Sequence, residues 1–196
     1  ALAQQAQWLR EGWQMGVSIN ISAAHLLAPG FANFLKRYLN EHKELDPTLI
    51  ALEILESTAL DDMQQASQVI AQCLELGIKV ALDDFGTGFS SLSYLRSLPV
   101  DIIKIDKSFI FRMREDDSDR AIVESVIYMA QRFNRTVLAE GVETRRHAEI
   151  LATLGCDLIQ GFGVARPMPA SDVVDWVRTW QASHPLPVPP FVQGGQ

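Results

Sequence analysis

The sequence predicts an α/β fold in which parallel strands alternate with helices. Short runs rich in β-branched residues alternate with longer amphipathic segments along most of the 196 residues. Gly16, Gly77 and Gly155 each close a helical segment just before a strand, and Pro99 ends another before Val100. Strands that are separated by helices pair in parallel through crossover connections, so an α/β architecture is expected.

The elements follow one another in a regular order. A first helix is expected over Ala1–Met15, and six strands over Val17–Ile21, Leu49–Leu55, Ile78–Leu82, Asp101–Ile105, Thr136–Ala139 and Cys156–Ile159. The remaining helices are expected over Phe31–Glu41, Met63–Leu76, Ser90–Leu98, Asp119–Phe133, Arg145–Leu154 and Ala170–Trp180. An eight-stranded parallel barrel without its first two strands fits this count. A doubly wound open sheet is the alternative, although no glycine-rich dinucleotide motif follows any strand.

Composition excludes several classes of function. A formal net charge of -7 argues against binding to DNA or RNA polymers or to an anionic membrane surface. Cys73 and Cys156 lie far apart, which favours a reducing cytoplasmic compartment over a disulfide framework. No signal peptide or membrane-spanning run is present, and a tether elsewhere in a longer parent chain stays open. We expect one domain over residues 1–183 and a proline-rich tail over residues 184–196.

Polar side chains stand at or just after the carboxyl ends of the predicted strands. In a parallel barrel these ends share one face, and that face carries catalysis. Strand alternation places Asn20 on the polar face of its strand, and Lys104 inward between the outward-facing Ile103 and Ile105. The residues concerned are Asn20, Glu53, Asp83, Asp84, Lys104, Glu140 and Gln160.

This set of residue types suits metal-assisted hydrolysis. Four carboxylates and an amide at one place would repel each other unless cations bound between them, and hard oxygen ligands suit Mg²⁺ or Mn²⁺. Two such ions could activate a water and stabilise the leaving oxygen of a phosphodiester. An inward lysine needs anionic partners, which Glu53, Asp83, Asp84 and Glu140 could supply.

The segment Ala81–Ser91 resembles the most distinctive motif of EAL-domain phosphodiesterases. Other motifs of that family occur in the same order along the chain, and each lies at a strand end. They are Asn20-Ile-Ser22, Glu53-Ile-Leu-Glu56, Leu98–Asp106, Ala139-Glu-Gly-Val-Glu143 and Gln160-Gly-Phe162, followed by Arg166-Pro167.

The resemblance implies a TIM-like (β/α)8 barrel that hydrolyses cyclic di-GMP to 5′-pGpG with two Mg²⁺ or Mn²⁺ ions. It implies metal ligands at Asn20, Glu53, Asp83, Asp84 and Glu140, catalytic roles for Lys104 and Glu140, and substrate binding by Gln160. A supporting layer is implied at Glu56, Phe85, Gly86, Thr87, Gly88 and Glu143. Relatives also suggest a homodimer and an upstream sensory or GGDEF domain.

One departure from the family pattern stands out. No Glu-Ala-Leu stretch precedes Asn20, so we expect the two opening strands, one of them antiparallel, to be absent from this chain. By itself, the fragment is expected to be inactive and to associate. Three hypotheses stay open: a phosphodiesterase in the intact protein, an EAL module that binds cyclic di-GMP or a protein partner without turnover, and another metal-dependent barrel hydrolase.

Overall fold

In the part of the chain that the structure describes, six parallel strands form one sheet, and each strand pairs with the next strand along the chain. The structure is a computed structural model that describes residues 1–56, 62–87 and 92–183. The strands are β1 (Val17–Asn20), β2 (Ile50–Leu55), β3 (Lys79–Phe85), β4 (Ile102–Ile105), β5 (Thr136–Ala139) and β6 (Leu158–Ile159). A doubly wound sheet would reverse its strand order partway, whereas the order here is β1-β2-β3-β4-β5-β6. The partial TIM-like barrel is therefore confirmed.

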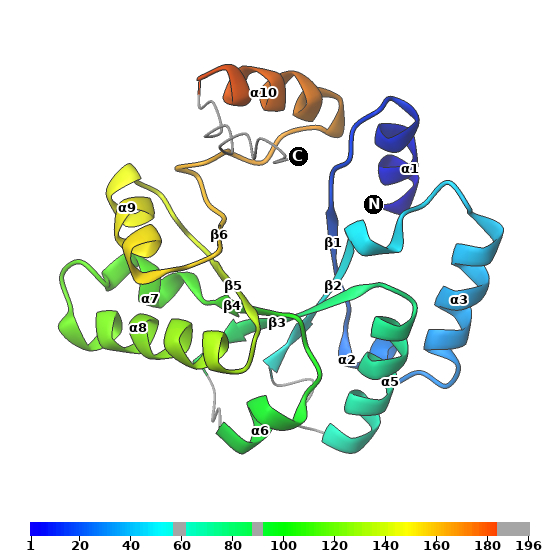
Figure 1. Cartoon of the computed structure of the whole chain (residues 1–196), viewed down its shortest axis with the longest axis horizontal. Helices are drawn as coiled ribbons and strands as arrows, with labels where there is room; N and C mark the ends of the chain where they lie inside the picture. The colour runs from blue at the N-terminus through cyan, green and yellow to red at the C-terminus, as the bar shows by residue number, and fades with distance from the viewer. Residues whose placement is uncertain (57–61, 88–91, 184–196) are drawn as a thin grey trace, which may run out of the picture. The chain divides into compact units, whose positions relative to one another are not determined.

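Each connection between successive strands contains at least one helix, while the first helix precedes β1 and the last follows β6 (Figure 1). The helices agree in position with most of the expected segments. In chain order they are α1 (Leu2–Arg10), α2 (Ala23–Leu26), α3 (Phe31–Glu41), α5 (Met63–Glu75), α6 (Leu92–Ser97), α7 (Lys107–Arg112), α8 (Asp117–Arg132), α9 (Arg145–Leu154) and α10 (Ala170–Ser183), with a 3-10 turn, η1, at Pro47–Leu49.

Three differences from the expected elements have local causes. The first helix ends at Arg10, and Gly12 follows with a φ of 83°, a left-handed conformation that ends a helix readily. The helices α2 and α7 were not expected because four and six residues are too short to show helical periodicity. Both begin at a side chain that caps them, Ser22 for α2 and Asp106 for α7.

The chain forms two compact units. The first, Ala1–Ala165, holds the whole sheet, and the second begins at Arg166 and contains α10. The proline-rich segment 184–196 lies outside the described residues. Of the helices that the structure does describe, none is long and apolar enough to cross a membrane.

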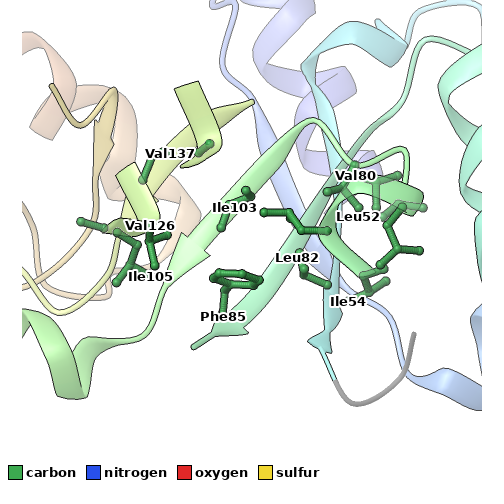
Figure 2. Packing of buried hydrophobic residues seen from close by; sticks show 14 of the residues in the cluster. Leu52, Ile54, Val80, Leu82, Phe85, Ile103, Ile105, Val126 and Val137 are labelled. Atoms are coloured by element: carbon green, nitrogen blue, oxygen red, sulfur yellow. The ribbon is translucent and has the colours of Figure 1, made fainter. Parts of the chain in front are cut away.

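Alternation along the strands separates the core from the site. The core lies between the sheet and its helices, and Figure 2 shows the side chains of successive strands packed against one another there. On β2 the buried Leu52 and Ile54 flank Glu53, and on β4 the buried Ile103 and Ile105 flank Lys104. The polar residues therefore point to the opposite face of the sheet, as the sequence predicts. The labelled core residues are Leu52, Ile54, Val80, Leu82, Phe85, Ile103, Ile105, Val126 and Val137.

Candidate active site

Lys104 lies at the centre of an acidic cluster on the face of the sheet opposite the core. Its Nζ atom is 2.7 Å from Glu53 Oε2, 2.8 Å from Asp83 Oδ1 and 2.7 Å from Glu140 Oε1. Lys104 is only 2% exposed, and Glu53 is 9% exposed. These four residues come from strands β2, β3 and β4 and from the residue after β5, so the parallel arrangement brings together side chains that are distant in sequence.

The carboxylate partners of Lys104 keep its side chain protonated. Burial by itself would lower the pKa of this ammonium, but the hydrogen bonds to Asp83, Glu140 and Glu53 raise the pKa above its ordinary value. The lysine is therefore a permanent cation at physiological pH. It keeps three carboxylates close together that would otherwise repel one another.

A β-bulge explains how two adjacent aspartates reach the same site. On β3, Leu82 pairs with Ile103 and Phe85 pairs with Ile105, so two residues of β3 lie opposite the single residue Lys104. These two residues are Asp83 and Asp84. Asp84 has a φ of 55°, in the left-handed region that aspartate tolerates better than most residues. The extra residue returns Phe85 to the core, where it is 3% exposed.

Three carboxylates could together hold a metal ion. Asp83, Asp84 and Glu140 each offer an oxygen, and these oxygens all lie within 4.8 Å of one another. Burial raises the pKa of Glu140, and burial together with the neighbouring charge of Asp83 raises the pKa of Asp84. An all-oxygen donor set on a partly buried, anionic surface fits a hard divalent cation such as Mg²⁺ or Mn²⁺.

The remaining predicted ligands lie on the neighbouring strands. Asn20, the last residue of β1, is exposed and pairs in register with Glu53 on β2. Glu53 contacts Lys104, and the register places the small Ala81 between Glu53 and Ile102. Because Ala81 has only a methyl group, it leaves room on this face for the Lys104 side chain.

The turn after β3 is tied to β2 by a buried glutamate. Glu56 is 3% exposed, and its Oε2 accepts a hydrogen bond of 3.4 Å from the backbone N–H of Gly86. Thr87 closes the turn by donating from Oγ1 to the backbone oxygen of Asp84 at 2.9 Å. This arrangement suits the predicted anchoring role of Glu56. The predicted residue Gly88 lies outside the described residues.

A pocket of about 310 Å³ opens beside Glu140. Its walls are Lys107, the turn after β5 with Gly141 and Glu143, and the segment after β6 with Gln160, Gly161 and Phe162. Two predicted residues, Gln160 and Glu143, therefore lie in this pocket and not among the carboxylates around Lys104. Since Glu140 belongs both to the pocket and to the acidic cluster around Lys104, a ligand in the pocket would lie next to that cluster.

Asp106 is a further acidic residue at the site that the sequence reasoning missed. It caps α7 by accepting from the backbone N–H of Ser108 at 2.9 Å, and together with burial and Asp83 it raises the pKa of the nearby Asp84. Burial raises the pKa of Asp106, but the hydrogen bonds from Ser108 outweigh this effect and lower it. Its position two residues after Lys104, just past a strand end, was the available signal.

Comparisons with known proteins match the chain to one family. The family model described as "EAL domain" matches residues 1–167. The bifunctional diguanylate cyclase/cyclic di-GMP phosphodiesterase MucR of Pseudomonas aeruginosa is 37% identical over 175 residues, which are 89% of this chain and 25% of MucR. The cyclic di-GMP phosphodiesterase PA2567 of the same organism is 34% identical over 178 residues, 91% of this chain and 30% of that protein.

Solved structures give the same result. The MucR phosphodiesterase in complex with c-di-GMP aligns with a TM-score of 0.82 at 38% identity, covering 88% of this chain and 70% of the other. The EAL domain of Mycobacterium smegmatis DcpA aligns with a TM-score of 0.83 at 35% identity, covering 95% of this chain and 82% of the other. The chain spans 25% and 30% of the two curated relatives named above, so it corresponds to one part of such proteins. From the family match and the shared fold, the chain belongs to the EAL domain family.

Proposed function

We propose that this chain is the catalytic domain of a phosphodiesterase that hydrolyses cyclic di-GMP to 5′-pGpG. The observation that carries the proposal is the cluster of Glu53, Asp83 and Glu140 around Lys104, with Asp84 beside it, at the carboxyl ends of parallel strands. Relatives with the same fold are named as cyclic di-GMP phosphodiesterases, and the MucR phosphodiesterase structure is a c-di-GMP complex.

In this proposal Asp83, Asp84 and Glu140 hold divalent metal, Mg²⁺ or Mn²⁺, with Asn20 and Glu53 completing a site for two ions. Their oxygen atoms are the ligands such ions prefer, and the spacing of the three carboxylates within 4.8 Å supports a shared site. Bound there, the metal supplies Lewis-acid stabilisation of phosphate oxygens and lowers the pKa of a coordinated water.

The side chains have separate tasks in the reaction. The Lys104 ammonium orients the attacking water by a hydrogen bond and offsets the charge that develops on the phosphate. Glu140, which Lys104 contacts at 2.7 Å, accepts a proton from that water. The water oxygen then bonds to phosphorus, the bond from phosphorus to the 3′ oxygen breaks, and the 3′ oxygen takes up the proton that Glu140 accepted. Gln160 contributes to substrate binding from the adjoining pocket.

We also propose a cellular location, an oligomeric state and a longer polypeptide for the domain. We place it in the cytoplasm, as a homodimer, within a longer polypeptide that can carry a sensory or GGDEF domain. MucR, which is named as a bifunctional diguanylate cyclase/cyclic di-GMP phosphodiesterase, is a precedent for a second activity in the same polypeptide.

The test is hydrolysis of cyclic di-GMP by the full-length protein with Mg²⁺ or Mn²⁺, beside an Asp83→Asn variant. The variant removes one carboxylate charge from the metal-ligand group while keeping the shape of the side chain. We expect 5′-pGpG from the wild type, none after chelation with EDTA, and at least about a hundredfold less from the variant. Binding of cyclic di-GMP without any product would refute the enzyme and identify the chain as a receptor module.

A further inference from the structure

We propose that Lys107 recognises a guanine base of the substrate and makes the pocket beside Glu140 selective for guanine. In this assignment the Nζ atom of Lys107 donates hydrogen bonds to the O6 and N7 acceptors of the base. The inference rests on the proposed function, because it takes a guanine dinucleotide as the ligand. Lys107 lies outside the acidic cluster, and in this assignment it contacts a base, which is a part of the ligand that does not react.

Lys107 differs from Lys104 in its surroundings. Lys104 is buried, and three carboxylates lie within 2.8 Å of its Nζ atom. Lys107 is exposed at the first position of α7. Within residues 1–56, 62–87 and 92–183, no carboxylate forms a salt bridge with it. It is also the one cation among the residues that line the pocket, so its donors are available to a ligand.

Two glycines hold the walls of the pocket close together. A Cβ atom at Gly141, where φ is +67°, would lie 2.5 Å from the Cβ atom of Lys107. A Cβ atom at Gly161 would lie 2.3 Å from the backbone nitrogen of Val142. The start of α7 therefore packs directly on the turn after β5, and the segment after β6 packs on the same turn. The position of Lys107 on the wall is set by these contacts before any ligand arrives.

The chemistry of the lining fits guanine better than adenine. Guanine presents O6 and N7 as acceptors, and adenine places an amino donor where guanine has O6. A lysine only donates, so it favours guanine at this position. Glu143, which only accepts when ionised, suits the N1–H and the 2-amino group that guanine also carries. Phe162, 54% exposed, gives the pocket an aromatic side chain on which a base can stack.

The test compares Lys107→Met with the wild type by calorimetric titration of cyclic di-GMP and cyclic di-AMP into the full-length protein in EDTA. Without metal the ligand is not turned over. We expect the Kd for cyclic di-GMP to rise about tenfold, and the Kd for cyclic di-AMP to change less than twofold. Lys107→Arg, which keeps the charge and the donors, should recover most of the affinity. Lys36→Met removes an exposed lysine on α3 and serves as the control.

Three results would overturn the inference. The first is a Kd for cyclic di-GMP within twofold of the wild type in Lys107→Met. The second is an equal loss for both dinucleotides, which would indicate that Lys107 contacts a phosphate. The third is no binding of cyclic di-GMP to the wild type with or without Mg²⁺, which would refute the substrate itself. Binding of cyclic di-GMP without hydrolysis would refute the phosphodiesterase, while the Kd comparison would still decide the role of Lys107.

Discussion

The ammonium group of Lys104 determines whether its carboxylate neighbours can stay close together without metal. Glu53, Asp83 and Glu140 all lie within 2.8 Å of it, and all are largely buried. Removing one partner from a buried ion pair leaves a charge without compensation, which is more costly than the pair is favourable. Because the partners raise the pKa of Lys104, its stabilisation is complete below about pH 10 and is lost only as the pH rises further.

We predict that Lys104→Met lowers the free energy of unfolding by about 3 kcal/mol in metal-free buffer at pH 7. Methionine keeps the length of the side chain but leaves three carboxylates to repel one another. Added Mg²⁺ should recover part of the loss, because a bound dication replaces the missing charge. Denaturant titration with and without Mg²⁺ measures both effects.

Lys79→Met, which removes an exposed lysine at the start of β3, is the matched control and should change stability by less than about 0.5 kcal/mol. If Lys104→Met unfolded at the wild-type denaturant concentration in EDTA, the carboxylates would not depend on the lysine.

The sequence alone predicts the positions of some residues around Lys104 and not of others. Period-two alternation correctly places Lys104 on the face opposite the core, since the buried Ile103 and Ile105 flank it. Alternation cannot place Asp83 and Asp84 on one face, because adjacent residues of a regular strand point in opposite directions. The bulge opposite Lys104 resolves this, and it depends on pairing with β4, which is distant in sequence. Asp106 was missed for a related reason, since its effect on the pKa of Asp84 also arises only on folding.

At the scale of elements, the two ends of the strands have different roles. The carboxyl ends carry the acidic cluster, whereas the amino ends carry aspartates that tie neighbouring strands together. Asp101, before β4, accepts from the backbone N–H of Val80 on β3 at 2.9 Å. Asp157, before β6, accepts from the backbone N–H of Val137 on β5 at 2.8 Å. Both contacts satisfy strand N–H groups of fully buried residues.

We therefore predict that Asp157→Ala destabilises the fold by about 1–3 kcal/mol without altering catalysis. The change leaves the N–H of Val137 buried without its acceptor, near the amino end of β5, where Val137 pairs with Ile103 and both side chains belong to the core. Thermal unfolding and kcat/KM for cyclic di-GMP, measured on the same samples, separate the two effects. Asp157→Asn keeps an acceptor oxygen and should cost less. Loss of activity with unchanged stability would contradict this division between the ends of the strands.

The lengths of the elements are less predictable than their existence. The expected strand Cys156–Ile159 shortens to Leu158–Ile159, and the helix expected from Asp119 begins at Asp117. The earlier start has a local cause, because the side chain of Asp116 accepts from the backbone N–H groups of Ser118 and Asp119. The sequence carried this capping signal within an acidic run that also resembles a solvated loop.

For the whole molecule, the decisive feature is strand order, which local patterns do not contain. A barrel and a doubly wound sheet both alternate strands and helices, and they differ in the side on which each crossover packs. The observed order β1-β2-β3-β4-β5-β6 settles this question, and it also leaves β1 and β6 as the two edges of the sheet. On β6, Leu158 is 46% exposed and Ile159 is 37% exposed.

These edges lead to our last prediction: the chain Ala1–Gln196, prepared by itself, associates in a concentration-dependent way. Unpaired strand edges that carry exposed apolar side chains favour pairing with another molecule, and charges at such an edge oppose it. Sedimentation velocity over a hundredfold range of concentration should show a rising average mass. Leu158→Lys should weaken the association by about tenfold, because docking a second copy would bury the added charge. Phe34→Lys replaces a side chain on α3 that is 50% exposed and belongs to neither edge strand, and should leave association unchanged. A wild-type chain that sediments as a monomer at every concentration would show that the edges are protected in a way that strand pairing alone does not reveal.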